Sequence, residues 1–136
     1  TRFMISLEQG VQLVWHAFED MMGGEIYVKK IPSMKVTDLA RVIAPTNTQK
    51  IIGIRPGEKL HEQMISSEDA WSTYEYLEHF KILPQIHDWH LDSERIKDGT
   101  KVPDGFVYDS NTNPHWMSDE ALLIWIEENR KKIGKM

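Results

Sequence analysis

The sequence predicts a mixed α/β fold, α+β in character, formed by a single domain that spans residues 1–136. Three observations lead to this class. The first 55 residues read as helix, strand, helix and strand; the middle of the chain is rich in loop-forming residues; and an amphipathic helix follows near the C-terminus. With 136 residues and 15.9 kDa, the chain is long enough to bury one hydrophobic core.

The first helix is predicted over residues 6–22. Ser6 and Gln9 have the spacing of a capping box, in which each side chain bonds the main-chain amide of the other. Apolar residues then recur at helical spacing, and the Gly23-Gly24 pair ends the helix because glycine tolerates left-handed backbone angles.

A strand, a second helix and a second strand are predicted at residues 25–29, 33–44 and 50–55. Both strands are short runs rich in β-branched residues, whereas the helix has apolar residues three and four apart and ends at Pro45. A helix that links two strands favours a right-handed crossover. We therefore expect the two strands to be parallel neighbours.

Beyond Gly57 the pattern weakens. Three short strands are predicted there, at residues 62–65, 73–76 and 80–83. Residues 84–114 are polar, with frequent Pro, Gly, Asp and Asn, and are expected to form ordered loops. The C-terminal helix is predicted over residues 118–132, where Ser118 and two following acids suit the start and a basic cluster suits the end.

Composition argues against several classes of function. Sixteen basic and twenty-one acidic residues give a net charge of −5, which argues against nucleic-acid binding and against a polybasic membrane patch. No run of about 18 apolar residues is present, and the lack of cysteine removes disulfides, thiolate metal sites and cysteine nucleophiles. The sequence begins at Thr1 without an initiator Met or a signal peptide, so we expect a fragment of a cytoplasmic protein.

Arg55 is the strongest candidate for a binding residue. Pro56 and Gly57 place it at a rigid corner, and a guanidinium held in this way suits bidentate binding of a phosphate or diphosphate. The alternative is an ordinary turn arginine paired with Glu58 or Glu62.

The other candidates are weaker. Lys59 adds a second positive charge to the same segment, and Arg2 either faces a ligand or is an exposed chain end. No metal site is predicted, because Ile65 stands where a zinc-binding helix that starts at His61 would need its second histidine.

Three motifs of nucleotide-binding and redox enzymes are missing from the sequence. Neither a G-x-G-x-x-G segment nor a P-loop occurs, and no tyrosine is followed four residues later by lysine. From its own residues, the chain has no predicted catalytic residue and no predicted cofactor.

Several segments resemble the C-terminal part of the inverting UDP-N-acetylglucosamine 4,6-dehydratases. These extended short-chain dehydrogenase/reductase proteins of bacteria feed pseudaminic acid, flagellin glycan, capsule and other polysaccharide synthesis. The resemblance lies in residues 1–11, 24–36, 53–62, 102–106, 109–113 and 116–118. The string Arg-Pro-Gly-Glu-Lys-Leu-His-Glu at 55–62 is its most specific feature.

The resemblance implies that this chain is the small sugar-nucleotide-binding part of such an enzyme. Arg55 then matches the arginine that grips the UDP diphosphate, and Arg2 matches a second arginine on the phosphate side. Lys59 and Glu62 share the motif as possible substrate-side residues. Family members are more than twice this length and bind NADP through an N-terminal Rossmann domain that carries the catalytic Tyr and Lys. The chain lacks those residues, so we expect it to be inactive alone.

Three functions stay open: the substrate-binding part of a 4,6-dehydratase (a lyase), a free-standing UDP-sugar-binding module, and an oligomerisation or interaction domain. We expect weak UDP-sugar binding, a Rossmann domain as partner in a full-length protein, and self-association as a homodimer. The surfaces expected to pair are Phe3, Ile5, the stripe of Trp15, Phe18 and Met22, and the edge of the 25–29 strand. The alternative is that the 84–114 loops cover this face and leave a monomer.

Overall fold

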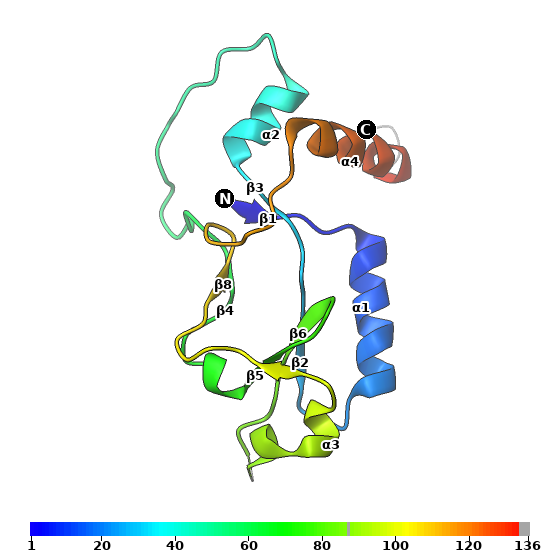
Figure 1. Cartoon of the computed structure of the whole chain (residues 1–136). Helices are drawn as coiled ribbons and strands as arrows, with labels where there is room; N and C mark the ends of the chain where they lie inside the picture. The colour runs from blue at the N-terminus through cyan, green and yellow to red at the C-terminus, as the bar shows by residue number, and fades with distance from the viewer. Residues whose placement is uncertain (87, 134–136) are drawn as a thin grey trace. The chain divides into compact units, whose positions relative to one another are not determined.

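The computed structural model describes residues 1–86 and 88–133 (Figure 1). The chain folds into two compact units, which are described separately. The first unit comprises Thr1–Ser6, Ile31–Glu62 and Ser110–Met136, and the second comprises Leu7–Lys30 and Gln63–Asp109. Both units contain helices and strands, which confirms the mixed α/β class. The expectation of a single domain stays a prediction.

The second unit is built on a four-stranded antiparallel sheet with the order β2-β6-β5-β7. Its strands are β2 (Ile26–Lys29), β5 (Thr73–Glu75), β6 (His79–Ile82) and β7 (Thr100–Lys101). All four residues of β6 are buried, because this strand has neighbours on both edges. The core of the unit gathers around Phe80 of β6, whose ring centre lies 5.0 Å from that of Tyr108 and 5.3 Å from that of Phe106.

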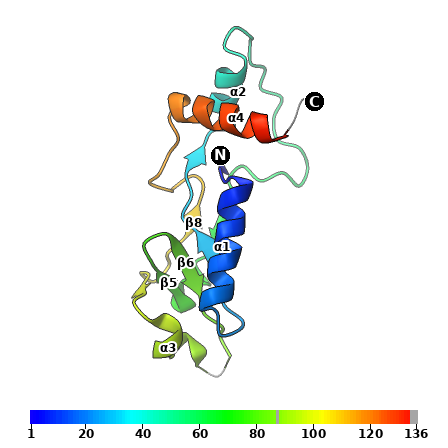
Figure 2. The ribbon, with the colours of Figure 1, turned by 90° about the vertical axis from the view of Figure 1, so that its right-hand side faces the viewer.

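Helix α1 (Leu7–Asp20) lies along the β2–β6 side of this sheet (Figure 2). The predicted helix at 6–22 is confirmed, with ends one and two residues shorter. Gly23 and Gly24 follow it with φ angles of 118° and 84°, which only glycine adopts at little cost. Gly24 is also confined by packing, since a Cβ there would lie 2.9 Å from the Pro84 ring.

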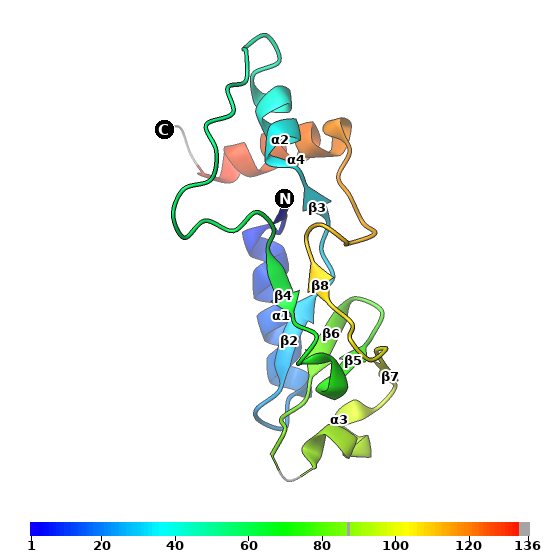
Figure 3. The same cartoon turned by 90° about the vertical axis from the view of Figure 1, so that its left-hand side faces the viewer.

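Short elements complete the second unit. Strand β4 (Gln63–Ile65) pairs antiparallel with β8 (Tyr108–Asp109), as Figure 3 shows. The predicted strands at 62–65, 73–76 and 80–83 are therefore confirmed to within about a residue at each end. The expectation that 84–114 is all loop is wrong. That segment also contains the 3₁₀ turn η2 (Trp89–Leu91), helix α3 (Ser93–Ile96), β7 and β8, and a 3₁₀ turn η1 (Ala70–Ser72) precedes β5.

The first unit combines a two-stranded sheet with two helices. Strand β1 (Arg2–Phe3) pairs antiparallel with β3 (Ser33–Met34), and the helices are α2 (Val36–Ile43) and α4 (Asp119–Ile133). The predicted helices at 33–44 and 118–132 are confirmed, except that the first three positions of the former belong to β3 and the helix cap. Arg41 of α2 bonds both carboxylate oxygens of Asp119, at 2.8 and 2.9 Å from one guanidinium nitrogen. Within the described ranges, no helix combines the length and apolar character needed to cross a membrane.

The predicted strand at 50–55, and its parallel pairing with 25–29, are wrong. Residues 50–55 form no strand, and β2 pairs antiparallel with β6 instead. Ile51, Ile52 and Ile54 are exposed. A β-branched run forms a strand only where a neighbouring strand supplies hydrogen bonds and the side chains can be buried against a core. Gly53, with φ of 85°, breaks the extended conformation in the middle of the run.

Candidate functional site

The predicted binding motif lies in the first unit, in the long segment that follows α2 (Figure 3). We call residues 53–62 the arginine loop. Arg55 opens a turn in which the Glu58 amide donates to the Arg55 carbonyl at 3.0 Å. Pro56 stands at the second position and Gly57, with φ of 80°, at the third, which is the residue pattern of a type II turn. The Glu58 carboxylate accepts a hydrogen bond from the Arg55 amide at 3.1 Å, which further stabilises the turn.

Arg2 reaches the arginine loop from strand β1, where its main chain pairs with Met34. Its guanidinium Nε lies 3.3 Å from a Glu62 carboxylate oxygen and its Nη2 lies 3.7 Å from one of Glu58. Its Nη1 donates to the carbonyls of Thr1, at 2.7 Å, and Leu60, at 3.3 Å. Arg2 is therefore a partly buried side chain held between two carboxylates and not an exposed chain end.

The four predicted site residues lie in two different environments. The structure brings Arg2 and Glu62 together, whereas Arg55 and Lys59 are exposed on the loop. Glu58 connects the two environments, because its carboxylate contacts both the Arg2 guanidinium and the Arg55 amide. The pairing with acids that the sequence suggested for Arg55 is observed for Arg2.

The sequence interpretation missed a second group of residues, which lies next to Arg2. The Thr1 hydroxyl oxygen is 2.8 Å from His61 Nδ1 and 2.7 Å from the Ser110 hydroxyl. The Ser110 hydroxyl in turn accepts from the Glu62 amide at 2.9 Å. We call His61, Thr1 and Ser110 the hydroxyl bridge. No local signal points to it, because Thr1 and Ser110 are 109 positions apart.

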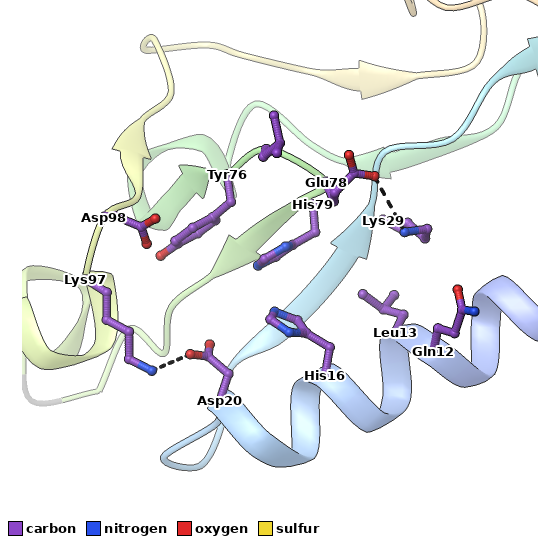
Figure 4. Close-up of a pocket in the computed structure, with 11 residues that line it drawn as sticks. Gln12, Leu13, His16, Asp20, Lys29, Tyr76, Glu78, His79, Lys97 and Asp98 are labelled. Carbon is purple, nitrogen blue, oxygen red and sulfur yellow. Dashed lines mark hydrogen bonds and ion pairs between the residues drawn. The ribbon is translucent and has the colours of Figure 1, made fainter.

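A pocket of roughly 440 Å³ lies in the second unit, between α1 and the β5–β6 hairpin (Figure 4). His16 and Asp20 line it from α1, Tyr76 and His79 from the hairpin, and Lys97 from the end of α3. The charged lining residues are two lysines and three acids, namely Lys29, Lys97, Asp20, Glu78 and Asp98. Such a balanced lining gives no preference for a phosphate.

Asp20 collects three donors at the edge of this pocket. It accepts from the Tyr27 hydroxyl and from Lys81 Nζ, each at 2.6 Å, and from Lys97. Burial alone would raise the pKa of the Asp20 carboxyl, but hydrogen bonds from these three donors outweigh it and hold the pKa well below its usual range. Lys81 is itself 2% exposed and also donates to the Arg95 carbonyl, so the group is a structural ion pair already satisfied.

His79 forms the floor of the same pocket. Its ring is stacked on Tyr76 with centres 4.6 Å apart and meets the His16 ring edge at 4.7 Å. Nε2 of His79 is buried without a hydrogen-bond partner among the described residues. Burial, reinforced by His16 and Lys81, lowers the pKa of His79 to about 4, so the imidazole is neutral at pH 7.

The described residues of the two units form neither a cluster of metal-ligating side chains nor a glycine turn that leads directly into a helix. Within the described ranges, no three metal-ligating side chains lie close enough to share an ion. NADP binding requires a glycine-rich turn between a strand and a helix. The described glycines with positive φ are Gly23, Gly24, Gly53, Gly57 and Gly105, and none of them directly precedes a helix.

The described residues thus combine a mixed α/β fold with an arginine turn whose Glu58 also contacts Arg2 of the first strand. The chain belongs to the family described as "Polysaccharide biosynthesis protein", which it matches over residues 1–84.

Several relatives of the chain are enzymes whose names specify a UDP-sugar. The chain is 53% identical, over 90% of its length, to the UDP-N-acetylglucosamine 4,6-dehydratase (inverting) of Campylobacter jejuni, of which it covers 38%. It is 36% identical, over 60% of its length, to the UDP-glucose 4-epimerase of Rickettsia canadensis, of which it covers 25%. Its fold is similar to the X-ray structure of Pen from Bacillus thuringiensis, with a TM-score of 0.76, 25% identity, and coverage of 94% of this chain and 38% of that one. The chain therefore spans less than half the length of these relatives.

Proposed function

We propose that this chain binds the UDP moiety of a nucleotide sugar, UDP-N-acetylglucosamine, as the substrate-binding part of a 4,6-dehydratase of bacterial surface-polysaccharide synthesis. The observation that carries the proposal is the Arg55–Glu58 turn, a rigid arginine corner with Arg2 tied to it through Glu58. The names of the relatives, which share UDP and differ in sugar, support the choice of ligand.

Arg55 is the residue that we place on the diphosphate. An exposed guanidinium on a fixed turn loses little freedom on binding and presents parallel N–H groups to two phosphate oxygens. Lys59, exposed further along the same loop, adds charge without a fixed geometry.

Arg2 has to exchange partners to take part. Its guanidinium faces the carboxylates of Glu58 and Glu62 at 3.7 and 3.3 Å. A diphosphate competes with these carboxylates for the same N–H groups. The free energy gained when Arg2 binds phosphate is therefore partly cancelled by the loss of its contacts with Glu58 and Glu62. We therefore propose weak UDP affinity, dominated by Arg55.

The proposal assigns no catalytic step to this chain. The 4,6-dehydratase reaction of the proposed parent needs NADP and a proton-transfer pair, and the residues of this chain supply neither. Purified chain is accordingly expected to form no 4-keto sugar from UDP-N-acetylglucosamine.

The test is a titration with UDP and with uridine, followed by the amide shifts of the arginine loop. Wild type is expected to bind UDP more tightly than uridine, and Arg55→Ala is expected to weaken UDP by about tenfold, the value of one charge-assisted bidentate contact. Arg130→Ala, an exposed arginine on α4, is the matched control and is expected to bind UDP like wild type. Equal affinity for UDP and uridine, or no shift near Arg55 at millimolar UDP, would contradict the proposal.

An interaction role has its own support in the second unit. Helix α1 exposes a stripe of large apolar side chains, with Trp15 65% and Phe18 67% exposed. Apolar patches of this kind are rarely left bare on a monomer, and a two-fold axis lets one patch cover another. We propose that the stripe pairs with that of a second copy to form a homodimer.

A further inference from the structure

We infer that the hydroxyl bridge of His61, Thr1 and Ser110 is a positioning device, which holds the Leu60–Glu62 end of the arginine loop against Arg2 and so presets the diphosphate site. The inference rests on the proposed function for the site, and it assigns a role to three residues outside the arginines themselves. Its evidence is the set of contacts that converge on Glu62 and on Thr1.

Ser110 fixes the main chain at Glu62 with two hydrogen bonds. The Ser110 amide donates to the Glu62 carbonyl at 2.8 Å, and the Glu62 amide donates to the Ser110 hydroxyl at 2.9 Å. Ser110 is fully buried, so water does not compete for these groups. The C-terminal end of an otherwise exposed loop is thereby anchored to a buried residue 48 positions away.

Thr1 connects this anchor to the strand that carries Arg2. Its main-chain nitrogen donates to the Leu60 carbonyl at 2.8 Å, and its carbonyl accepts from the Arg2 guanidinium at 2.7 Å. The guanidinium also donates to the Leu60 carbonyl and lies 3.3 Å from a Glu62 carboxylate oxygen, so Thr1 and the Arg2 side chain both contact the same short stretch of loop.

The donors and acceptors of the bridge form a consistent chain. The Glu62 amide donates to the Ser110 hydroxyl, which is then free to donate to the Thr1 hydroxyl. With the His61 proton on Nε2, the Thr1 hydroxyl can donate to Nδ1 of His61. In this direction each hydroxyl proton has an acceptor. Such a fully satisfied chain of short bonds resists rearrangement, which is the property that a preset binding site requires.

Three variants separate positioning from simple folding. Thr1→Val keeps the shape of the side chain and removes the hydroxyl, Thr1→Ser keeps the hydroxyl, and Ser110→Ala removes the acceptor of the Glu62 amide. We expect Thr1→Val and Ser110→Ala to weaken UDP binding about fivefold, the effect of one lost hydrogen bond, and Thr1→Ser to stay within about twofold of wild type. Affinity for uridine should not change in any of them, whereas a variant that partly unfolds would lose uridine and UDP binding alike.

A second readout needs no ligand. The solvent-exchange rate of the Glu62 amide, measured by NMR on the free chain, should rise about fivefold in Thr1→Val and Ser110→Ala and stay near the wild-type rate in Thr1→Ser. UDP binding in Thr1→Val equal to wild type, or an impaired Thr1→Ser, would overturn the inference. If wild type itself does not bind UDP, the proposed function fails; faster exchange at Glu62 would then still support the positioning role of the bridge, and an unchanged rate would overturn it.

Discussion

Acidification between pH 7 and pH 5 should destabilise this protein through His79, and the structure sets the size of the effect. The His79 imidazole is 8% exposed, is stacked on Tyr76, and has Nε2 without a partner among the described residues. Its surroundings also include His16 and Lys81, so a proton on His79 meets positive or protonatable neighbours, and Asp20 offsets only part of their effect. Protonation therefore costs more in the folded state than in the unfolded chain.

The magnitude follows from the two pKa values. His79 titrates at 6.5 when unfolded and at about 4 when folded, so its contribution is present above 6.5 and is lost as the pH falls toward 4. At pH 5 these values give a loss of about 2 kcal/mol relative to pH 7. Solvent at the pocket mouth screens the neighbouring charges, so we expect about 1 kcal/mol. Asp20 does not contribute in this range, because its folded pKa lies below its unfolded value and its stabilisation is lost only below about pH 4.

The assay is urea unfolding at pH 7, 6 and 5, followed by tryptophan fluorescence, for wild type, His79→Phe and His115→Asn. Phenylalanine keeps the stack on Tyr76 and carries no proton, so His79→Phe should lose about 1 kcal/mol less than wild type between pH 7 and pH 5. His115 is exposed, so His115→Asn should follow the wild-type profile. The reasoning would be refuted by a His79→Phe profile that falls as steeply as that of wild type.

Three further predictions concern other parts of the chain. The side-chain amide of buried Asn113 donates to the Ile31 carbonyl at 2.9 Å and to the Ser33 hydroxyl at 3.0 Å. Asn113→Ala should therefore lower the free energy of unfolding by about 2 kcal/mol, and a change below about 0.5 kcal/mol would contradict this prediction. Burial, reinforced by Asp20, raises the pKa of the Tyr27 hydroxyl. Its contribution to stability is therefore complete below about pH 10 and is lost as the pH rises further, so the melting temperature of Tyr27→Phe should fall less than that of wild type over the same alkaline range. Light scattering at tens of micromolar should show a dimer that Phe18→Glu converts to a monomer, whereas a wild-type mass near 16 kDa would refute pairing through α1.

Local patterns in the sequence are enough to predict three helices and the arginine turn. The helices at 7–20, 36–43 and 119–133 follow from apolar spacing, caps and terminal charges that lie within a few residues of each other. The Arg55–Glu58 turn is of the same kind, because Pro56 and Gly57 restrict the backbone wherever they occur. The candidate diphosphate arginine could therefore be named before the structure was known.

Features that depend on a distant partner follow from the tertiary fold. Strand β2 pairs with β6, some fifty residues away, while the equally β-branched run at 50–55 stays unpaired, because backbone pairing and burial are properties of two segments and not of one. The same reason applies to the site. The Arg2 guanidinium lies between Glu58 and Glu62, and Thr1 contacts Ser110 across 109 positions, because the fold brings these segments into contact. No spacing in the sequence encodes these contacts.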